Sequence, residues 1–146
     1  MIALASDHGG FELMEAVKAY LESKGYLYEA FGAVSHESID YPVVAVQAAN
    51  AIVRGDCDKG IVICGTGVGV SIAANKVPGI RAALCTHTYM AEMARNHNDA
   101  NVLALGGRVI DADLAIEIVD TFLTTEFSTD ERHHRRVEML IELDKR

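Results

Sequence analysis

The feature that most constrains the fold is a regular alternation of short apolar runs with longer segments of helical periodicity. The clearest apolar run, GIVIC at residues 60–64, has the pattern of a strand buried on both faces and ends in a glycine-rich segment. Strands that alternate with helices are typical of a parallel sheet covered by helices on both faces. In such sheets ligands bind beyond the carboxyl ends of the strands, so chemistry is expected at the strand exits.

The apolar runs predict five strands, at residues 2–6, 27–31, 60–64, 81–85 and 101–105. Helical spacing predicts helices at 11–24, 42–54, 88–96, 111–123 and 128–143, and one more that follows the glycine-rich segment and ends at Asn75. A chain of 146 residues is one domain's worth. We therefore expect residues 1–146 to form a single α/β domain, a Rossmann-like three-layer sandwich with a five-stranded parallel sheet.

Composition excludes several classes of protein. The 21 acidic and 13 basic residues give a formal net charge of -8, so the chain lacks the basic face that non-specific nucleic-acid binding requires. No apolar run reaches the roughly 18 residues of a membrane-spanning helix. The first eight residues have no basic lead and reach Asp7 too early for a signal peptide, which predicts a cytoplasmic protein.

The glycine-rich segment Gly65-Thr66-Gly67-Val68-Gly69 can bring backbone N–H groups together on an anion at a helix N-terminus. It is not a Walker A loop, because no Gly-Lys-Ser/Thr follows. Its third glycine also comes one residue early for the dinucleotide fingerprint, and the expected acidic residue is missing. A nicotinamide cofactor is therefore disfavoured and no cofactor is predicted. An anion-binding loop and a purely structural turn both remain open.

Three cysteines, without a C-x-x-C pair, argue against both a disulfide framework and a zinc site. Cys64 stands at the strand exit beside the predicted helix N-terminus, where a thiol can serve as a base or nucleophile. Cys85 falls within a strand pattern and is expected to be a buried structural residue. Cys57 lies between Asp56 and Asp58, whose charge should disfavour its thiolate.

Other strand and helix ends carry polar groups with two interpretations each. Asp7 and His8 could form an acid–base pair, or Asp7 could simply cap the next helix. His97-Asn98 could belong to a site or end a helix. His36 and His134 are interpreted as surface residues.

The last predicted helix carries a basic cluster in an acidic protein. Arg132 and Arg136 share one helical face and could hold a phosphate, or could balance nearby acidic side chains in solvent. Val137, Leu140 and Ile141 form an apolar strip beside them. The helix is therefore expected to pack against another surface, for example a second subunit.

Six segments, taken in order, resemble the family of the type B ribose-5-phosphate isomerases and the galactose-6-phosphate isomerase subunits, over essentially the whole chain. They are Asp7-His8-Gly9-Gly10-Phe11, Asp40-Tyr41-Pro42, the run from Cys64 to Lys76 (CGTGVGVSIAANK), His97-Asn98, Gly106-Gly107-Arg108, and Arg132-His133 with Arg136.

The resemblance implies an aldose–ketose isomerase that interconverts ribose 5-phosphate and ribulose 5-phosphate through an enediolate, without a metal. By the same resemblance Cys64 takes the C2 proton and Thr66 moves a proton between O1 and O2. The remaining implied roles are ring opening by Asp7 and His97, an anion hole from the N–H groups of Gly65, Gly67, Val68 and Gly69, enediolate binding by Asn98, a sugar pocket lined by Tyr41, and a phosphate grip of His8, Arg108, Arg132 and Arg136 with His133 beside them.

The family is dimeric with active sites built across the interface. The resemblance therefore implies that His97, Asn98 and Arg108 come from the partner chain, and that the last helix lies at the interface. Val70 stands where one branch of the family has a glutamate, so the chain belongs with the cysteine branch. The complete motif set favours a self-sufficient homodimer over the unlike pairs of the galactose-6-phosphate enzymes, and leaves open whether dimers pair into tetramers.

Two alternatives remain open at this stage. One is an isomerase of the same mechanism that acts on a hexose phosphate, such as allose 6-phosphate or galactose 6-phosphate. The other is a non-catalytic sugar-phosphate sensor on the same fold.

Overall fold

The predicted alternation of strands and helices is confirmed in a computed structural model that describes residues 1–145. The strands are β1 (Ile2–Ser6), β2 (Tyr28–Gly32), β3 (Lys59–Cys64), β4 (Ala82–Leu84) and β5 (Val102–Gly106). The helices are η1 (His8–Gly10, a 3-10 turn), α1 (Phe11–Ser23), α2 (Tyr41–Val53), α3 (Val68–Asn75), α4 (Thr88–Asn96), α5 (Ala112–Thr124) and α6 (Glu131–Leu143). The five strands form one parallel sheet in the order β2-β1-β3-β5-β4.

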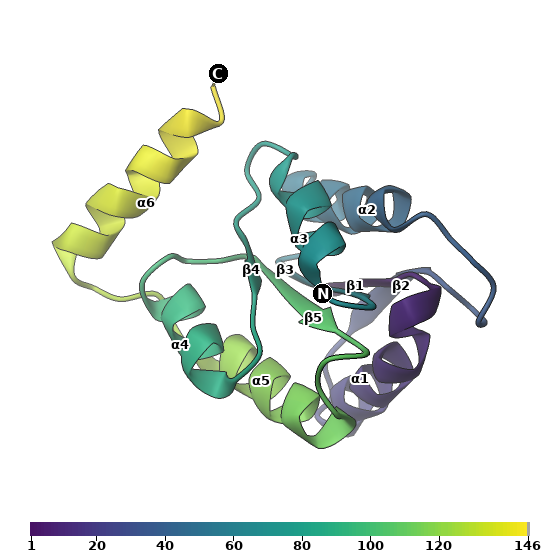
Figure 1. Ribbon diagram of the computed structural model, residues 1–146. Helices are drawn as coiled ribbons and strands as arrows, with labels where there is room; N and C mark the ends of the chain where they lie inside the picture. Colours follow the sequence, from purple (N-terminus) through teal and green to yellow (C-terminus); the bar gives the residue numbers. More distant parts are fainter. Residues whose placement is uncertain (146) are drawn as a thin grey trace.

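Helices cover both faces of this sheet, as predicted (Figure 1). Alternate residues of β3 face opposite layers: Ile61 and Ile63 pack with α1, α4 and α5, whereas Val62 packs with α2 and α3. The second layer is rich in alanine, which lets α2 and α3 approach the sheet closely. Both faces of the central strands are therefore buried, which explains their continuous apolar runs.

The strand order places the chemistry-bearing loops side by side. The chain goes to one side of β1 to build β2 and to the other side to build β3, β5 and β4, so the switch point lies between β1 and β3. Ser6 pairs with Ile63, and Cys64 pairs with Gly106. The loops after β1, β3 and β5 consequently leave the sheet side by side, at the carboxyl ends of the strands.

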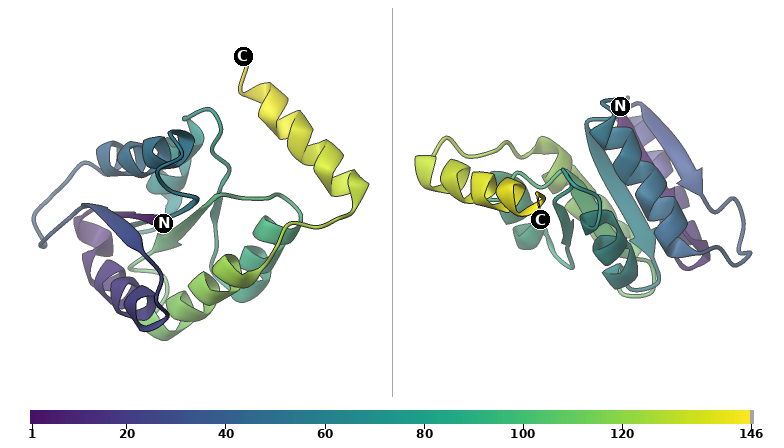
Figure 2. Two further views of the ribbon diagram at one scale, coloured as in Figure 1. Left: turned by 180° about the vertical axis from the view of Figure 1, so that it is seen from behind. Right: turned by 90° about the horizontal axis from the view of Figure 1, so that it is seen from above.

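Helix α6 extends away from the sheet and its covering helices (Figure 2). Its His133 and Val137 are buried, at 7% and 5% exposed, but Leu140 and Ile141 are 42% and 44% exposed. The Asp144 carboxylate accepts a hydrogen bond from the Gly79 N–H at 2.8 Å, so the far end of α6 returns to the loop before β4. The predicted apolar strip is thus only partly covered by its own chain.

Two predicted boundaries shift for local reasons. Helix α6 begins at Glu131 rather than 128, because the Asp130 carboxylate caps it by accepting from the Arg132 N–H at 2.8 Å. Strand β4 is shorter than predicted, and at its start the Arg81 N–H donates to the Asn101 side chain at 2.8 Å. None of the helices in residues 1–145 is long and apolar enough to cross a bilayer.

Candidate active site

Glycines allow the three strand-end loops to pack backbone against backbone. A Cβ added at Gly9 would lie 3.0 Å from the Gly65 nitrogen, and one added at Gly107 would lie 2.7 Å from the Gly9 oxygen. A Cβ at Gly106 would meet the Thr66 oxygen at 2.5 Å. These contacts leave no room for side chains, so the loops after β1, β3 and β5 form one continuous floor.

A cavity of about 420 Å³ opens on this floor above the end of β3. Its lining residues are Asp7, Tyr41, Cys64, Gly65, Thr66, Val68, Gly69, Ile72 and Arg108. The structure thus brings together most of the residues that were predicted to surround the reacting carbons. Ile72 was missed, although its position four residues after Val68 on one helical face could have indicated it.

The Cys64 sulfur is held at the base of the cavity by the loop that follows it. The side chain is buried, and the Gly67 N–H donates a hydrogen bond to its Sγ at 3.2 Å. Gly67 takes a left-handed conformation with φ of 81° immediately before α3. An N–H donor at the start of a helix is a suitable partner for negative charge on sulfur.

Asp7 and Thr66 both combine a structural hydrogen bond with a place in the cavity. The Asp7 carboxylate accepts from the N–H groups of Gly9 at 2.9 Å and Gly10 at 3.2 Å, so it caps the η1 turn that leads into α1 and not α1 itself. The Thr66 hydroxyl accepts from the Val68 N–H at 3.2 Å. The two interpretations of Asp7 are therefore compatible, because capping fixes the carboxylate where it also lines the cavity.

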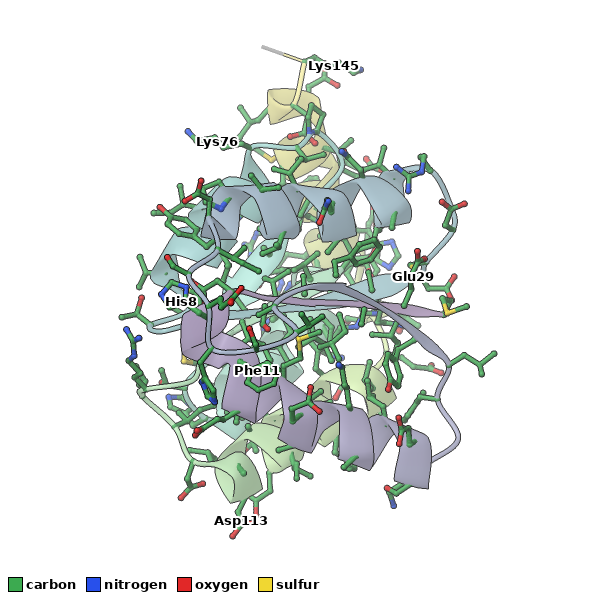
Figure 3. The ribbon with its side chains drawn as sticks, turned by 90° about the vertical axis from the view of Figure 1, so that its right-hand side faces the viewer. His8, Phe11, Glu29, Lys76, Asp113 and Lys145 are labelled. Atoms are coloured by element: carbon green, nitrogen blue, oxygen red, sulfur yellow. The ribbon has the colours of Figure 1, made fainter. Side chains whose placement is uncertain are left out.

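A second cavity of about 230 Å³ lies beside the first and shares Arg108 with it. Its lining also includes His8 and His36. The His8 Nδ1 accepts a hydrogen bond from the Ile39 N–H at 3.2 Å, so neutral His8 carries its proton on Nε2. Figure 3 shows His8 beside the start of α1, where Phe11 makes an edge contact with the His36 ring at 5.0 Å.

His36 is exposed, as predicted, yet it lines this cavity, which the sequence analysis did not predict.

The expectation that Arg108 reaches the site from a partner chain is wrong, because Arg108 lines the cavity of its own chain. Strand β5 lies next to β3, and the Arg108 N–H donates to the Gly65 carbonyl at 2.9 Å. The Arg108 side chain also packs on Gly65: a Cβ added at Gly65 would lie 2.9 Å from the Arg108 Nη1.

The remaining predicted residues form a separate cluster around the end of α4. The rings of His97 and His133 stack with centroids 4.0 Å apart and planes 11° apart. Asn98, which follows His97, is exposed, and so are Arg132 and Arg136, which lie on α6 with His133. His134 is also exposed and stacks on Phe127 at 4.2 Å, in agreement with its surface interpretation.

This cluster lies toward the amino ends of the strands, whereas Cys64 lies at their carboxyl ends. Helix α4 runs back from the end of β4 to the start of β5, so His97 comes shortly before Val102. Val102 pairs with Gly60, four residues before Cys64, and a strand rises about 13 Å over that distance. Within one chain, the two halves of the predicted site are therefore apart.

The other two cysteines differ from Cys64 in their surroundings. Burial raises the pKa of the Cys85 thiol to about 11. Burial also raises the pKa of the Cys57 thiol, and Glu29, Asp56 and Asp58 raise it further. The predicted direction for Cys57 is confirmed, but burial is a larger cause than the flanking acids.

Substitution of Gly67 by alanine tests the geometry of the loop. The new Cβ would lie 2.5 Å from the Leu84 Cδ1 and 2.8 Å from the Leu105 carbonyl carbon, at a positive φ. We expect a loss of about 2–4 kcal/mol in unfolding free energy, measured by urea denaturation. Gly25→Ala is the matched control, because Gly25 also has a positive φ but nothing within 4 Å. Equal losses in the two variants would contradict the close packing around Gly67.

The stacked histidines predict a pH dependence of stability. Burial lowers the pKa of His133, and the neighbouring His97 and Arg132 lower it further. The unfolded chain therefore binds this proton more readily, so stability falls as pH drops through about 6.5, the ordinary histidine value. Unfolding free energies at about pH 8 and about pH 5 should differ less in His133→Gln than in the unmodified chain. An unchanged difference would contradict the role of His133.

Residues 1–145 hold no group of three or more His, Cys, Asp or Glu side chains that could bind a metal ion.

The sequence matches the Ribose/Galactose Isomerase family over residues 2–140. It is 46% identical over 145 residues to ribose-5-phosphate isomerase B of Escherichia coli, with 99% of this chain and 97% of the relative covered.

Solved structures of similar proteins have the same fold. A ribose-5-phosphate isomerase B from Clostridium thermocellum superposes with a TM-score of 0.96 at 54% identity, covering 99% of this chain and 97% of that one. A ribose 5-phosphate isomerase from Thermotoga maritima gives a TM-score of 0.93 at 53% identity, with 97% of each chain covered.

Proposed function

Because this chain belongs to the ribose/galactose isomerase family, we propose that it interconverts D-ribose 5-phosphate and D-ribulose 5-phosphate with Cys64 as the base. One observation carries the mechanism: a buried thiol at a strand end lines the same cavity as the Asp7 carboxylate and the Thr66 hydroxyl. A proton-transfer isomerisation needs such a base next to polar groups that can handle the sugar's hydroxyl protons. We also propose that the enzyme needs no metal and works in the cytoplasm.

The first step is opening of the ribofuranose ring. One group removes the proton of the anomeric hydroxyl, the other gives a proton to the ring oxygen, and the bond between C1 and that oxygen breaks. We assign these roles to Asp7 and to His97 of the partner subunit. Ribulose 5-phosphate carries its phosphate on O5 and cannot form a furanose ring, so the reverse direction starts from an open chain.

The second step moves a proton from C2 to C1. The Cys64 thiolate takes the C2 proton, and the electron pair passes into a cis-enediolate. The resulting thiol returns a proton to C1, while the Thr66 hydroxyl carries the proton of O2 to O1. The loop from Gly65 to Gly69 supplies N–H donors, of which that of Gly67 bonds Cys64 and that of Val68 bonds Thr66 before substrate arrives.

The phosphate belongs at the second cavity, which His8 and Arg108 both line. A neutral His8 with its proton on Nε2 can donate to a phosphate oxygen, and the Arg108 guanidinium can bind bidentately. Arg132 and Arg136 of the partner subunit would complete the grip. Tyr41 would line the sugar pocket. Its ring packs on Gly69, since a Cβ added at Gly69 would lie 2.6 Å from the ring.

A homodimer with shared active sites would unite the two separated clusters. Helix α6 carries Arg132 and Arg136 on an exposed surface and leaves Leu140 and Ile141 partly uncovered. A second copy that covers these apolar side chains would also bring His97 and Asn98 toward the cavity of its neighbour. The supporting observation is that neither cluster alone has both a base and a complete set of phosphate and ring-opening groups.

The reaction is tested by following ketose formation from ribose 5-phosphate with a chelator present, and with allose 6-phosphate and galactose 6-phosphate in parallel. We expect the highest kcat/KM on ribose 5-phosphate. Higher activity on a hexose phosphate would keep the mechanism and change the substrate. Inactivity on all three would favour a sugar-phosphate sensor, and inhibition by the chelator would contradict metal independence.

A further inference from the structure

The turn that carries His97 and Asn98 has an unusual backbone at its next residue. Asp99 has a φ of 45°, and within residues 1–145 it is the single non-glycine residue with a positive φ. Aspartate tolerates this region better than most residues, but the conformation still costs free energy. Contacts around the turn must therefore hold it in place.

Two arginines from different elements provide these contacts. Arg95 of α4 is only 8% exposed, and its Nη1 donates to the Asp99 Oδ1 at 2.9 Å and to the Ala100 carbonyl at 2.7 Å. Arg81, at the start of β4, donates from Nε to the Asn98 carbonyl at 3.1 Å and from Nη2 to the Asp99 carbonyl at 2.8 Å. The Asp99 carboxylate also lies 3.4 Å from the Arg81 Nη2. The backbone from the Asn98 carbonyl to Ala100 is thus fixed by charge-assisted hydrogen bonds.

The same cluster is joined to the segment that leads into α6. The Arg95 Nε donates to the Thr125 carbonyl at 3.3 Å, and Asn96 donates from Nδ2 to the Glu126 carbonyl at 3.3 Å. The Ser128 N–H donates to the Asn96 carbonyl at 2.9 Å. The end of α4 and the start of α6 are therefore held together, which places His133 against His97.

We infer that Arg81, Arg95 and Asp99 are positioning residues for ring opening, because they fix the turn that presents His97 and Asn98. None of the three lines the cavity above Cys64, so they act through the turn and not on the substrate. The inference rests on the proposed role of His97. A buried arginine that bonds both a carboxylate and two carbonyls has a larger effect on local geometry than an exposed ion pair.

Asp99→Asn and Arg81→Lys are suitable test variants. Asparagine also accepts a positive φ but loses the charged contacts, and lysine keeps the charge of Arg81 but loses the forked contact with two carbonyls. A displacement of His97 by about 1 Å should lower the steady rate of ribose 5-phosphate turnover about 10- to 100-fold, measured after the free open-chain sugar has been consumed. From ribulose 5-phosphate, which needs no ring opening, we expect a change of about threefold or less. Arg54→Gln is the matched control, because it breaks the exposed Arg54–Asp56 pair and should change neither direction.

The outcomes separate the inference from the proposed function. Equal losses in both directions, or no loss in either, would overturn the positioning role. His97→Ala is measured in parallel: if it shows the directional loss and the two network variants do not, only the inference fails. If His97→Ala itself loses both directions equally, the ring-opening assignment fails. Should Asp99→Asn not fold, Arg81→Lys alone decides the result.

Discussion

Replacement of Cys64 by alanine is expected to lower kcat by about 10³-fold or more, in both directions of the isomerisation. The thiolate is the proposed base for the C2 proton and for the return of that proton to C1. The cavity around Cys64 is lined by one carboxylate, that of Asp7, which already accepts hydrogen bonds from Gly9 and Gly10. We therefore expect no other group in the chain to replace the thiol efficiently.

Binding of the substrate should survive this substitution. The proposed phosphate site is the second cavity, which His8 and Arg108 line and Cys64 does not. Calorimetric titration with ribose 5-phosphate should give a Kd within about threefold of the unmodified protein. Cys57→Ala is the matched control, since it removes another buried thiol that lies outside the cavity and should leave kcat unchanged. Normal turnover in Cys64→Ala would exclude Cys64 as the base.

The second large effect is expected for His97→Ala, and it should depend on direction. The variant would lose the proposed ring-opening partner of Asp7 but keep the thiol, Thr66 and the glycine-rich loop. We expect the steady rate of ribose 5-phosphate turnover to fall about 100-fold, because that rate is limited by uncatalysed ring opening in solution once the free open-chain sugar has been consumed. From ribulose 5-phosphate the loss should be much smaller, since the product can close its ring in solution.

The control for this measurement is His87→Ala. His87 is exposed at the other end of the same helix, and its side chain makes no capping hydrogen bond. It should behave like the unmodified enzyme in both directions. A His97→Ala enzyme as active on ribose 5-phosphate as the unmodified chain would show that ring opening does not depend on this residue.

The elements could be predicted almost to the residue because the buried strands are continuous apolar runs and the helices keep a clear period. The strand exits followed directly from that pattern, which is why Asp7, Cys64 and Thr66 were predicted near one another. Boundaries that depend on one side chain were harder: the Asp130 cap, which starts α6, resembles its polar neighbours in sequence.

The arrangement of the site depended on strand order, which the residue pattern does not encode. The neighbour relation of β3 and β5 decides that Arg108 lies in the cavity of its own chain. The direction of α4 decides that His97 lies toward the amino ends of the strands, away from Cys64. His36 was missed for a related reason, since only the folded loop brings it to the cavity that His8 lines. Motifs in a sequence thus indicated which residues matter but not which of them share a chain's cavity.

Mixing two inactive variants tests most directly whether one active site is built from two subunits. Cys64→Ala and His97→Ala chains would be co-refolded, and turnover of ribose 5-phosphate measured while mass spectrometry counts mixed dimers. Each mixed dimer has one site with both residues intact, so random pairing should restore about one quarter of normal activity. No recovery despite mixed dimers would contradict an active site shared between two subunits.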